Sequence, residues 1–186
     1  MKITTHWPRA RLRPAQIIGL AIALVACVIY FGVLHLLDGR AKSYLEEVRQ
    51  SNRSLYLTIL RQTQGFDTYL AEYTELEGYD SFRPLTPVFL VGRWTMRDEP
   101  MRLSPGTTPT ECSNPLTLNY GLLLEHDAGG LTLSVQYRIN GKIVEVRNAA
   151  TGIMPIHLVS YGGQLDHIEF VPPGESETVY GYLCGR

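Results

Sequence analysis

The sequence lacks the short motifs that mark many enzymes. It contains no G-x-S-x-G nucleophile elbow, no H-E-x-x-H zinc motif, no C-x-x-C pair and no glycine-rich phosphate loop. Internal repeats and low-complexity segments are absent as well. These absences place an enzyme last among the candidate functions, and they lead us to expect neither a cofactor nor a metal.

An excess of basic residues is also missing. Lysine and arginine total 17, aspartate and glutamate total 18, and the formal net charge is −1. A basic surface is the usual electrostatic footprint of a protein that binds nucleic acid. Residues 1–14, which precede the first apolar run, are too few for a DNA-binding domain. We therefore expect no direct contact with nucleic acid.

Cysteine is scarce, with three copies in the chain. Cys27 lies in an apolar run, where it is a small apolar filler or, if Leu24–Cys27 acts as a lipobox, a lipidation site. Cys112 and Cys184 lie in the remainder of the chain, and two cysteines in an oxidising compartment usually pair. A disulfide between them is the favoured interpretation, and free thiols or a crosslink to a partner are the alternatives.

One long apolar run, residues 15–37, contains no formal charge. As a helix it would span roughly 34 Å, enough to cross a hydrocarbon core of about 30 Å. Its N-terminal flank carries four basic residues and no acidic one: Lys2, Arg9, Arg11 and Arg13. Because basic flanks stay in the cytoplasm, we expect a single-pass protein of the bacterial inner membrane. Residues 1–14 would be cytoplasmic, 15–37 would form the transmembrane helix, and the rest would lie in the periplasm.

Three other interpretations of this run compete with an anchor. A cleaved signal peptide has an apolar core of only about 7 to 15 residues. A lipoprotein signal usually turns polar soon after its cysteine, whereas residues 28–37 stay mostly apolar. A buried core helix rarely runs this long without a polar face. An uncleaved transmembrane anchor is therefore favoured.

The chain beyond the anchor begins with helix formers and then becomes ambiguous. Residues 38–53 predict a juxtamembrane helix. Residues 54–60 alternate and are rich in β-formers, which predicts a strand, although a heptad-like spacing offers a continuing helix as the alternative. Residues 66–80 fit either a strand or a short helix. We expect residues 54–186 to form one periplasmic β domain.

From Val88 onward the pattern is mainly that of β-strands. The loop 104–115 is dense in proline, glycine, serine and threonine. Asn140-Gly141 between two alternating runs is a strong hairpin signal. The features predict a small antiparallel β-barrel or sandwich. Strands are expected at 88–96, 100–103, 116–126, 131–139, 142–149, 156–161, 164–171 and 177–184.

Three histidines beyond the anchor are candidates for a pH-responsive surface, because histidine titrates near neutral pH. They are His126, His157 and His167. An aspartate adjoins His126 and another adjoins His167, and such pairs can serve acid–base chemistry or bind metal. Adjacent residues on a strand point to opposite faces, so we expect neither pair to converge.

Gly92-Arg93-Trp94 resembles the G-x-W on the opening strand of lipocalin-type barrels, where the tryptophan packs across the closed end. Trp94 is therefore expected in the core, with a ligand or partner contact as the alternative. Tyr120, Tyr137 and Tyr180 are further candidates for such contacts, since tyrosines can line an amphipathic cavity. Ordinary strand positions are the alternative for these tyrosines.

The overall plan resembles that of the ToxS-like, FidL-like and PsaF-like accessory proteins of membrane-bound transcription regulators. The likeness is carried by the basic tail, the anchor, the juxtamembrane helix and the β domain. Locally, Gly92–Asp98 running on to Leu103-Ser104-Pro105 is similar to a G-x-W-x-x-x-D segment followed by apolar residues and proline. The resemblance implies a lipocalin-like periplasmic domain that binds a bitopic regulator with a cytoplasmic DNA-binding domain. A bile-salt or fatty-acid ligand in a joint pocket is implied by some relatives.

Three functions follow as hypotheses. The first is a non-enzymatic accessory protein that forms a heterodimer with a membrane-anchored regulator, which would complete an open edge strand of the barrel. The second is a structural component of a secretion or pilus assembly. The third is an anchored module that binds a lipid-like ligand alone. A large apolar cavity would favour ligand sensing, and a filled core with an exposed edge would favour a structural role.

Overall fold

A computed structural model of the chain describes residues 14–113, 115–125 and 132–185. The chain divides into two compact units, residues 1–52 and 53–186. The first unit contains the helix α1 and the second contains two short helices and all the described strands. The two units are described separately below.

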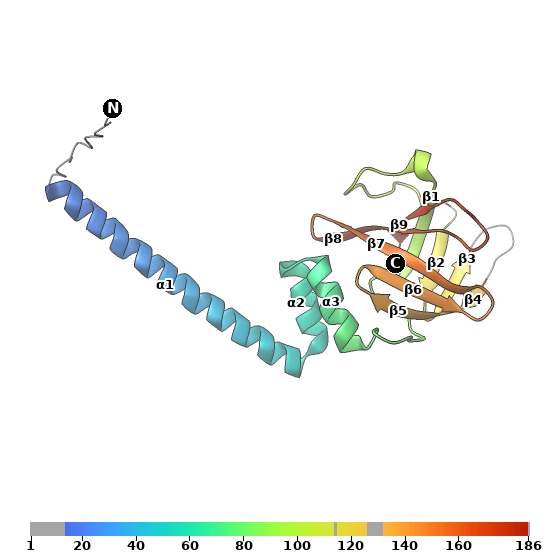
Figure 1. Ribbon diagram of the computed structural model, residues 1–186, viewed down its shortest axis with the longest axis horizontal. Coiled ribbons are helices and arrows are strands. Elements are labelled where there is room, and N and C mark those ends of the chain that lie inside the picture. The colour runs from blue at the N-terminus through green and yellow to red at the C-terminus, as the bar shows by residue number, and fades with distance from the viewer. Residues whose placement is uncertain (1–13, 114, 126–131, 186) are drawn as a thin grey trace, which may run out of the picture. The chain divides into compact units, whose positions relative to one another are not determined.

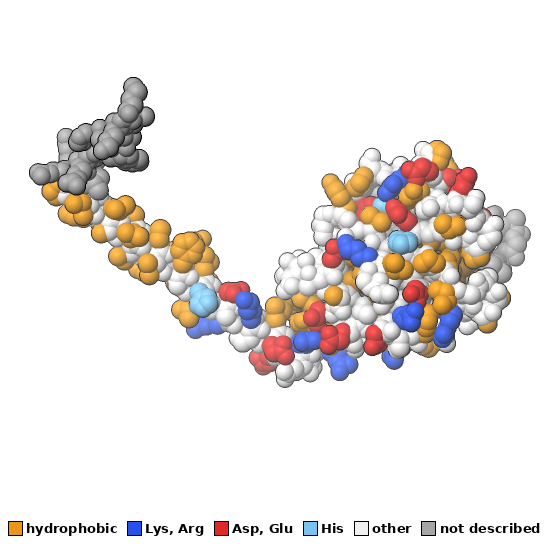
Figure 2. Space-filling model, in the orientation of Figure 1, with side chains coloured by type: hydrophobic (Ala, Val, Ile, Leu, Met, Phe, Trp, Pro, Cys, Tyr) orange, Lys and Arg blue, Asp and Glu red, His pale blue; other side chains and the backbone are white. Residues whose placement is uncertain are grey.

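The helix α1 (Pro14–Ser51) is continuous through the expected end of the anchor. Among the described residues, its part from Gln16 to Ser51 is the one helix long and apolar enough to cross a membrane, by length and composition. Figure 2 shows hydrophobic side chains along its first part and charged side chains near its C-terminal part. The expected juxtamembrane helix is therefore an extension of α1, and an ion pair of 2.7 Å between Asp38 and Lys42, one turn apart, supports the helix where the apolar run ends.

The second unit begins with α2 (Arg53–Thr63), and the prediction of a strand at 54–60 is wrong. Tyr56, Leu57 and Leu60 are buried on one side of α2, at the spacing of neighbouring helical turns. Between them Thr58 is exposed and Ile59 is half-buried, so the alternation of this segment does not report strand pairing. Packing of the apolar face has overridden local propensity here.

The helix α3 (Phe66–Glu77) resolves the ambiguity of residues 66–80. Its buried aromatic residues Phe66, Tyr69 and Tyr73 surround Phe89, with ring centroids 5.5, 6.3 and 5.5 Å from that of Phe89 and near-perpendicular planes. Edge-to-face packing of this kind adds to the stabilisation that comes from burying aromatic surface. The helix ends at Gly78, whose φ of 71° allows the left-handed C-cap.

The strands form one antiparallel sheet with the order β4-β3-β2-β1-β9-β8-β7-β6-β5. The first and last strands in this order are separated along the chain only by Val135, so the sheet curls into a nearly closed nine-stranded barrel (Figure 1). This confirms the predicted mainly β, barrel-like fold. The strands are β1 (Gly92–Arg97), β2 (Pro115–Asn119), β3 (Leu122–Glu125), β4 (Thr132–Ser134), β5 (Gln136–Asn140), β6 (Ile143–Asn148), β7 (Gly152–Tyr161), β8 (Gln164–Phe170) and β9 (Val179–Gly185).

The segment expected as one strand at 131–139 is interrupted at Val135. Because of this break, its two parts form the two edge strands of the sheet, β4 and β5. Its first part pairs with β3 and its second part with β6. The backbone N–H of Val135 donates to the carbonyl of Gly121 at 2.8 Å. On the free edge of β5, Tyr137 and Arg83 exchange two backbone hydrogen bonds of 2.8 Å. The expected open edge for a partner strand is therefore occupied along β5.

Tight turns account for two further differences from the sequence prediction. The expected single strand at 116–126 is the hairpin β2–β3, turned by Tyr120 and Gly121 with φ angles of 45° and 77°. The expected hairpin at Asn140-Gly141 is present, but its turn is centred on Gly141-Lys142. Only Gly141 of that turn has a positive φ, so the turn is not the type I′ that the Asn-Gly pair suggested.

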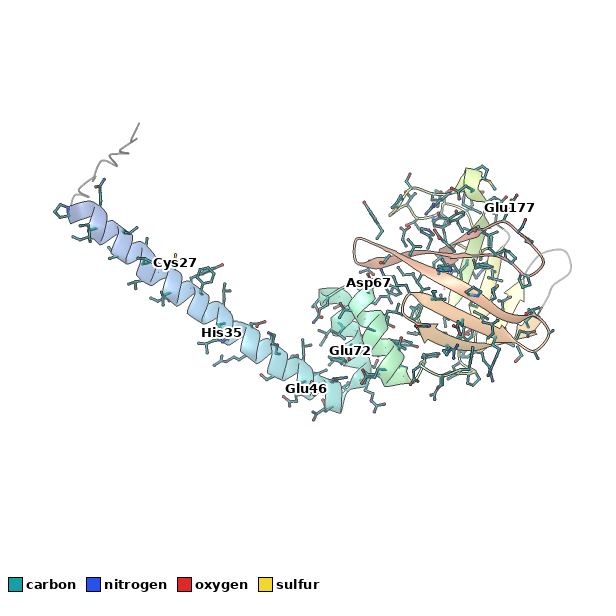
Figure 3. The ribbon with its side chains drawn as sticks, viewed as in Figure 1. Cys27, His35, Glu46, Asp67, Glu72 and Glu177 are labelled. Carbon is teal, nitrogen blue, oxygen red and sulfur yellow. A yellow bond between two sulfur atoms is a disulfide. The ribbon has the colours of Figure 1, made fainter. Side chains whose placement is uncertain are left out.

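The N-terminus of α3 is fastened to the turns at one end of the barrel (Figure 3). The carboxylate of Asp67 accepts hydrogen bonds from Lys142 Nζ at 2.6 Å and Ser160 Oγ at 2.8 Å. The backbone N–H of Phe66 donates to the carbonyl of Gly163 at 2.8 Å, in the β7–β8 turn. The helix pair α2–α3 thus covers the barrel end that carries the β5–β6 and β7–β8 turns.

Substituting Asp67→Asn is expected to lower the free energy of unfolding by less than about 1 kcal/mol at neutral pH, because the ion pair with Lys142 is largely exposed. The hydrogen bond from Lys142 lowers the pKa of Asp67, with Ser160 adding to the effect and desolvation opposing it. A lowered folded-state pKa stabilises the fold above the unfolded-state value, and this contribution is lost as pH falls through the folded-state value. In denaturant titrations, the wild type should have a higher free energy of unfolding than the variant at neutral pH and the same value in strong acid. An advantage that persisted in acid would contradict this role.

Residues 98–113, named here the strap, fold over the outer surface of β8 and β9. The strap contains the 3-10 helix η1 (Glu99–Met101), which overlaps the short strand expected at 100–103. The backbone N–H of Leu103 donates to Tyr182 Oη at 3.0 Å, and Thr95 Oγ1 donates to the carbonyl of Ser113 at 2.7 Å. The predicted disulfide between Cys112 and Cys184 is present and ties the strap to the last strand.

Candidate ligand-binding site

A cavity of about 580 Å³ opens at the barrel end opposite α2 and α3. At this end β1, β6 and β8 finish and β2, β7 and β9 begin. The helices and tight hairpin turns close the other end, whereas longer connections border this one. Alternation along the strands sends every second side chain inward, so the strand ends supply the wall of the cavity.

The wall is mostly apolar, and its methionines stand out. Of the four methionines in the chain, all but Met1 line the cavity. Methionine is unbranched and polarizable, so it adapts to the shape of an apolar ligand. The apolar lining comprises Met96, Met101, Leu116, Leu123, Leu133, Val135, Val146, Met154, Phe170, Pro172, Pro173 and Val179.

Four polar residues complete the lining: Asp98, Asn148, Thr151 and Glu175. Both carboxyl residues are exposed. Asn148 is already engaged, since its Nδ2 donates to the carbonyl of Ser134 at 2.7 Å and its Oδ1 accepts from the N–H of Ala150 at 2.7 Å. The arrangement can hold an amphiphile with its apolar part among the strands and its head group beside the carboxylates.

Trp94 lies inside the barrel but belongs to the core. Its side chain is 1% exposed, and its Nε1–H donates to the carbonyl of Leu90 at 2.8 Å. Met96, two residues further along β1, lines the cavity, whereas Trp94 does not. Trp94 was expected in the core, and it is buried there.

The three candidate tyrosines lie apart, and none lines the cavity. Tyr137 is fully buried, its hydroxyl is 3.3 Å from Thr86 Oγ1, and burial raises its pKa to about 12. Tyr180 lies beneath the strap, where it donates to Glu99 and carries the Arg102 guanidinium over its ring. Tyr120 is 80% exposed at the tip of the β2–β3 hairpin. The three candidate tyrosines therefore do not form a shared ligand pocket.

His167 forms a buried cluster with two carboxylates. Its Nδ1 is 2.7 Å from Asp166 Oδ2 and its Nε2 is 3.0 Å from Glu169 Oε1. The expectation that Asp166 and His167 diverge is wrong, because a β-bulge interrupts the alternation. Val159 pairs with His167 and Ser160 with Leu165, which leaves Asp166 as the extra residue.

The two described candidate histidines, His157 and His167, have different environments. His157 is exposed on β7, His167 is buried, and His126 lies outside the described residues. The His167 cluster fastens the strap: the N–H of Gly106 donates to Asp166 at 2.7 Å, and Arg102 pairs with Glu169 at 3.1 Å. The geometry thus assigns His167 a structural role in holding the strap.

Substituting His167→Leu is expected to destabilise the β domain by about 1–3 kcal/mol, because it leaves two carboxylates without their buried partner. The strap should then detach more often and expose Arg102 to trypsin. The matched variant His157→Leu changes an exposed residue on the neighbouring strand and should leave both properties unchanged. Thermal unfolding and limited proteolysis measure the two effects. Equal behaviour of the two variants would exclude a fastening role for His167.

The cavity residues themselves were not predicted as a site from the sequence. Strand alternation identifies which side chains point inward, but it does not tell which end of the barrel remains unfilled. The signal that was available is the placement of three methionines in or beside predicted strands. Among the described residues, no group of three histidine, cysteine or acidic residues is arranged to hold a metal ion.

Comparison with known proteins identifies no relative from which the site can be interpreted. No family model matches the chain, and neither a curated protein nor a solved structure matches it.

Proposed function

We propose that the chain is a non-enzymatic, membrane-anchored binding protein whose β-barrel holds a lipid-like ligand. The observation that carries this proposal is the apolar cavity of about 580 Å³ at the barrel mouth. Small-molecule sites commonly measure about 300–1,000 Å³, are mostly apolar and contain few polar groups. The mouth of a β-barrel is a recurrent place for such sites. Of the alternatives set out above, a cavity favours ligand sensing over a purely structural role.

The proposed location is the bacterial inner membrane, with the barrel in the periplasm. The basic residues before α1 favour a cytoplasmic N-terminus. The Cys112–Cys184 disulfide fits an oxidising compartment on the other side of the membrane. In this arrangement α1 keeps the barrel close to the bilayer, which is the natural source of a lipid-like ligand.

A matched pair of variants tests the binding function. Met154→Trp places a larger side chain in the cavity, whereas Ile153→Trp changes the neighbouring residue of β7, which is exposed and does not line the cavity. Full-length protein is extracted from its native membrane in polymer-bounded nanodiscs and examined by native mass spectrometry. We expect a bound small molecule on the wild type and on Ile153→Trp, and its loss from Met154→Trp. Equal occupancy of both variants would contradict binding in the cavity.

A partner role is the second candidate, and an exposed apolar patch favours it. Tyr120 and Leu85 are 80% and 60% exposed. Tyr120 and Leu85 are held near each other because the N–H of Gly121 donates to Thr86 Oγ1 at 2.9 Å. An accessory protein of a bitopic transcription regulator would use such a patch to contact the regulator's periplasmic domain.

Site-specific photocrosslinking tests the partner role. A photoreactive amino acid replaces Tyr120 in the full-length protein in its native membrane, and Tyr161, which is also exposed, serves as the control position. A crosslink from position 120 alone to a membrane protein with a cytoplasmic DNA-binding domain would support the role. Crosslinks to secretion or pilus subunits would favour the structural alternative instead.

A further inference from the structure

We infer that the cavity selects amphiphiles whose head group donates hydrogen bonds or carries positive charge, and discriminates against anionic amphiphiles. The inference rests on the proposed function and specifies its ligand class. It concerns the head-group end of the cavity, where the polar lining residues lie. It follows from the sign of the charged side chains at that end.

The charged groups that line the cavity are both acidic. Asp98 and Glu175 belong to the lining, and among the described residues no lysine or arginine does. An anionic head group at the mouth would therefore meet like charges without a counterion.

Arg97, which follows the inward-facing Met96 on β1, lies on the opposite face of the sheet, beside Tyr180. Three other basic residues near the lining in the chain make contacts on the outer surface of the barrel. Arg147 follows the lining residue Val146 and stacks on Phe82, with its guanidinium carbon 4.0 Å from the ring centroid. Arg138 pairs with Glu145 at 2.5 Å. Arg102 pairs with Glu169 beneath the strap at 3.1 Å. These contacts hold three guanidinium groups away from the cavity.

Hydrogen-bonding capacity leads to the same ligand class. Ionised carboxylates only accept hydrogen bonds, so Asp98 and Glu175 can bind a hydroxyl, an amine or an ammonium group. The Asn148 side chain already makes one hydrogen bond to a backbone group at each polar end. The Thr151 hydroxyl, which also lines the cavity, can donate or accept, so the two carboxylates decide the preference. The polar part of the lining therefore favours a donor head group such as that of a long-chain amine or alcohol. Fatty acids and bile salts, as carboxylates, fit it poorly.

Three photoreactive probes with one alkyl chain and different head groups test this preference. The probes are a diazirine-bearing long-chain amine, alcohol and carboxylic acid, each added to full-length protein in nanodiscs of zwitterionic phospholipid. Mass spectrometry locates the labelled residues, and labelling of α1 corrects for the amount of each probe in the bilayer. We expect cavity labelling to fall in the order amine, alcohol, acid. The ratio of amine to acid should be about tenfold at low salt and smaller at high salt.

Charge-neutralising variants complete the test. Asp98→Asn combined with Glu175→Gln should bring the ratio of amine to acid close to one. Glu177→Gln removes a carboxylate from the same β8–β9 connection at a residue that does not line the cavity (Figure 3), and should leave the ratio unchanged. The head-group preference would be overturned if the three probes labelled the cavity equally, or if the double variant left their order of labelling unchanged. Either result would leave the binding function standing. Failure of all three probes to label the cavity would overturn both.

Discussion

Replacing Cys112 and Cys184 together by alanine is expected to lower the free energy of unfolding of the β domain by about 4 kcal/mol. The disulfide closes a loop with a sequence separation of 72, and the chain-entropy account of crosslinks gives about 4 kcal/mol for a loop of that length. The strap would also lose its covalent tie to β9. Because domains are commonly stable by only about 5–15 kcal/mol, the double variant should lose a large fraction of its stability.

The measurement is thermal unfolding of the full-length protein in nanodiscs, followed by near-ultraviolet circular dichroism. Cys27→Ala is the matched control, because Cys27 is an exposed, unpaired cysteine on α1. The control should unfold at the same temperature as the wild type, both when the two are compared without reductant and when they are compared with it. A double variant as stable as the control would show that the strap is held by its noncovalent contacts alone.

Substituting Trp94→Ala is expected to cost about 3–5 kcal/mol, the usual range for truncating a buried tryptophan. Trp94 is almost completely buried and its Nε1–H is bonded to the carbonyl of Leu90. Trp94→Phe keeps most of the buried surface and removes the donor, so it should cost less, about 1–3 kcal/mol. The difference between the two variants separates packing from hydrogen bonding.

Denaturant unfolding of the two variants, with Tyr120→Ala as an exposed aromatic control, measures these effects. The control should change the free energy of unfolding by no more than about 0.5 kcal/mol. Ligand occupancy of Trp94→Phe should equal that of the wild type, since Trp94 does not line the cavity. Loss of ligand without loss of stability would instead give Trp94 the contact role that the sequence left open.

The parts of the fold that could be predicted from the sequence are those fixed by local chemistry. The long uncharged run predicted a helix, and α1 contains it. Asn140-Gly141 marked a hairpin that the structure contains. In the expected strand 131–139, the alternating residues Val135, Tyr137 and Ile139 are buried. These signals are local, so no knowledge of the partner strands was needed.

The errors arose where tertiary packing or an irregularity decided the outcome. Residues 54–60 became helical because Tyr56, Leu57 and Leu60 pack together on one side of α2. A turn with a positive φ at Tyr120 divided an expected strand, and tyrosine gives no warning of such a conformation. The bulge at Asp166 brought two adjacent side chains together, although regular alternation would have separated them. The cavity could not be predicted from any single strand, because it is the part of the barrel that the side chains do not fill.

The most direct test of the binding function uses the methionines as probes. Full-length protein with ¹³C-labelled methionine methyl groups is placed in nanodiscs, and a long-chain alcohol is titrated into the sample. Binding in the barrel mouth predicts saturable shifts of the methyl signals of Met96, Met101 and Met154, with no shift of Met1. In the variant Met154→Trp, the signals of Met96 and Met101 should no longer shift when the alcohol is added. Saturable binding of the alcohol without any shift at these three methyl groups would contradict the account.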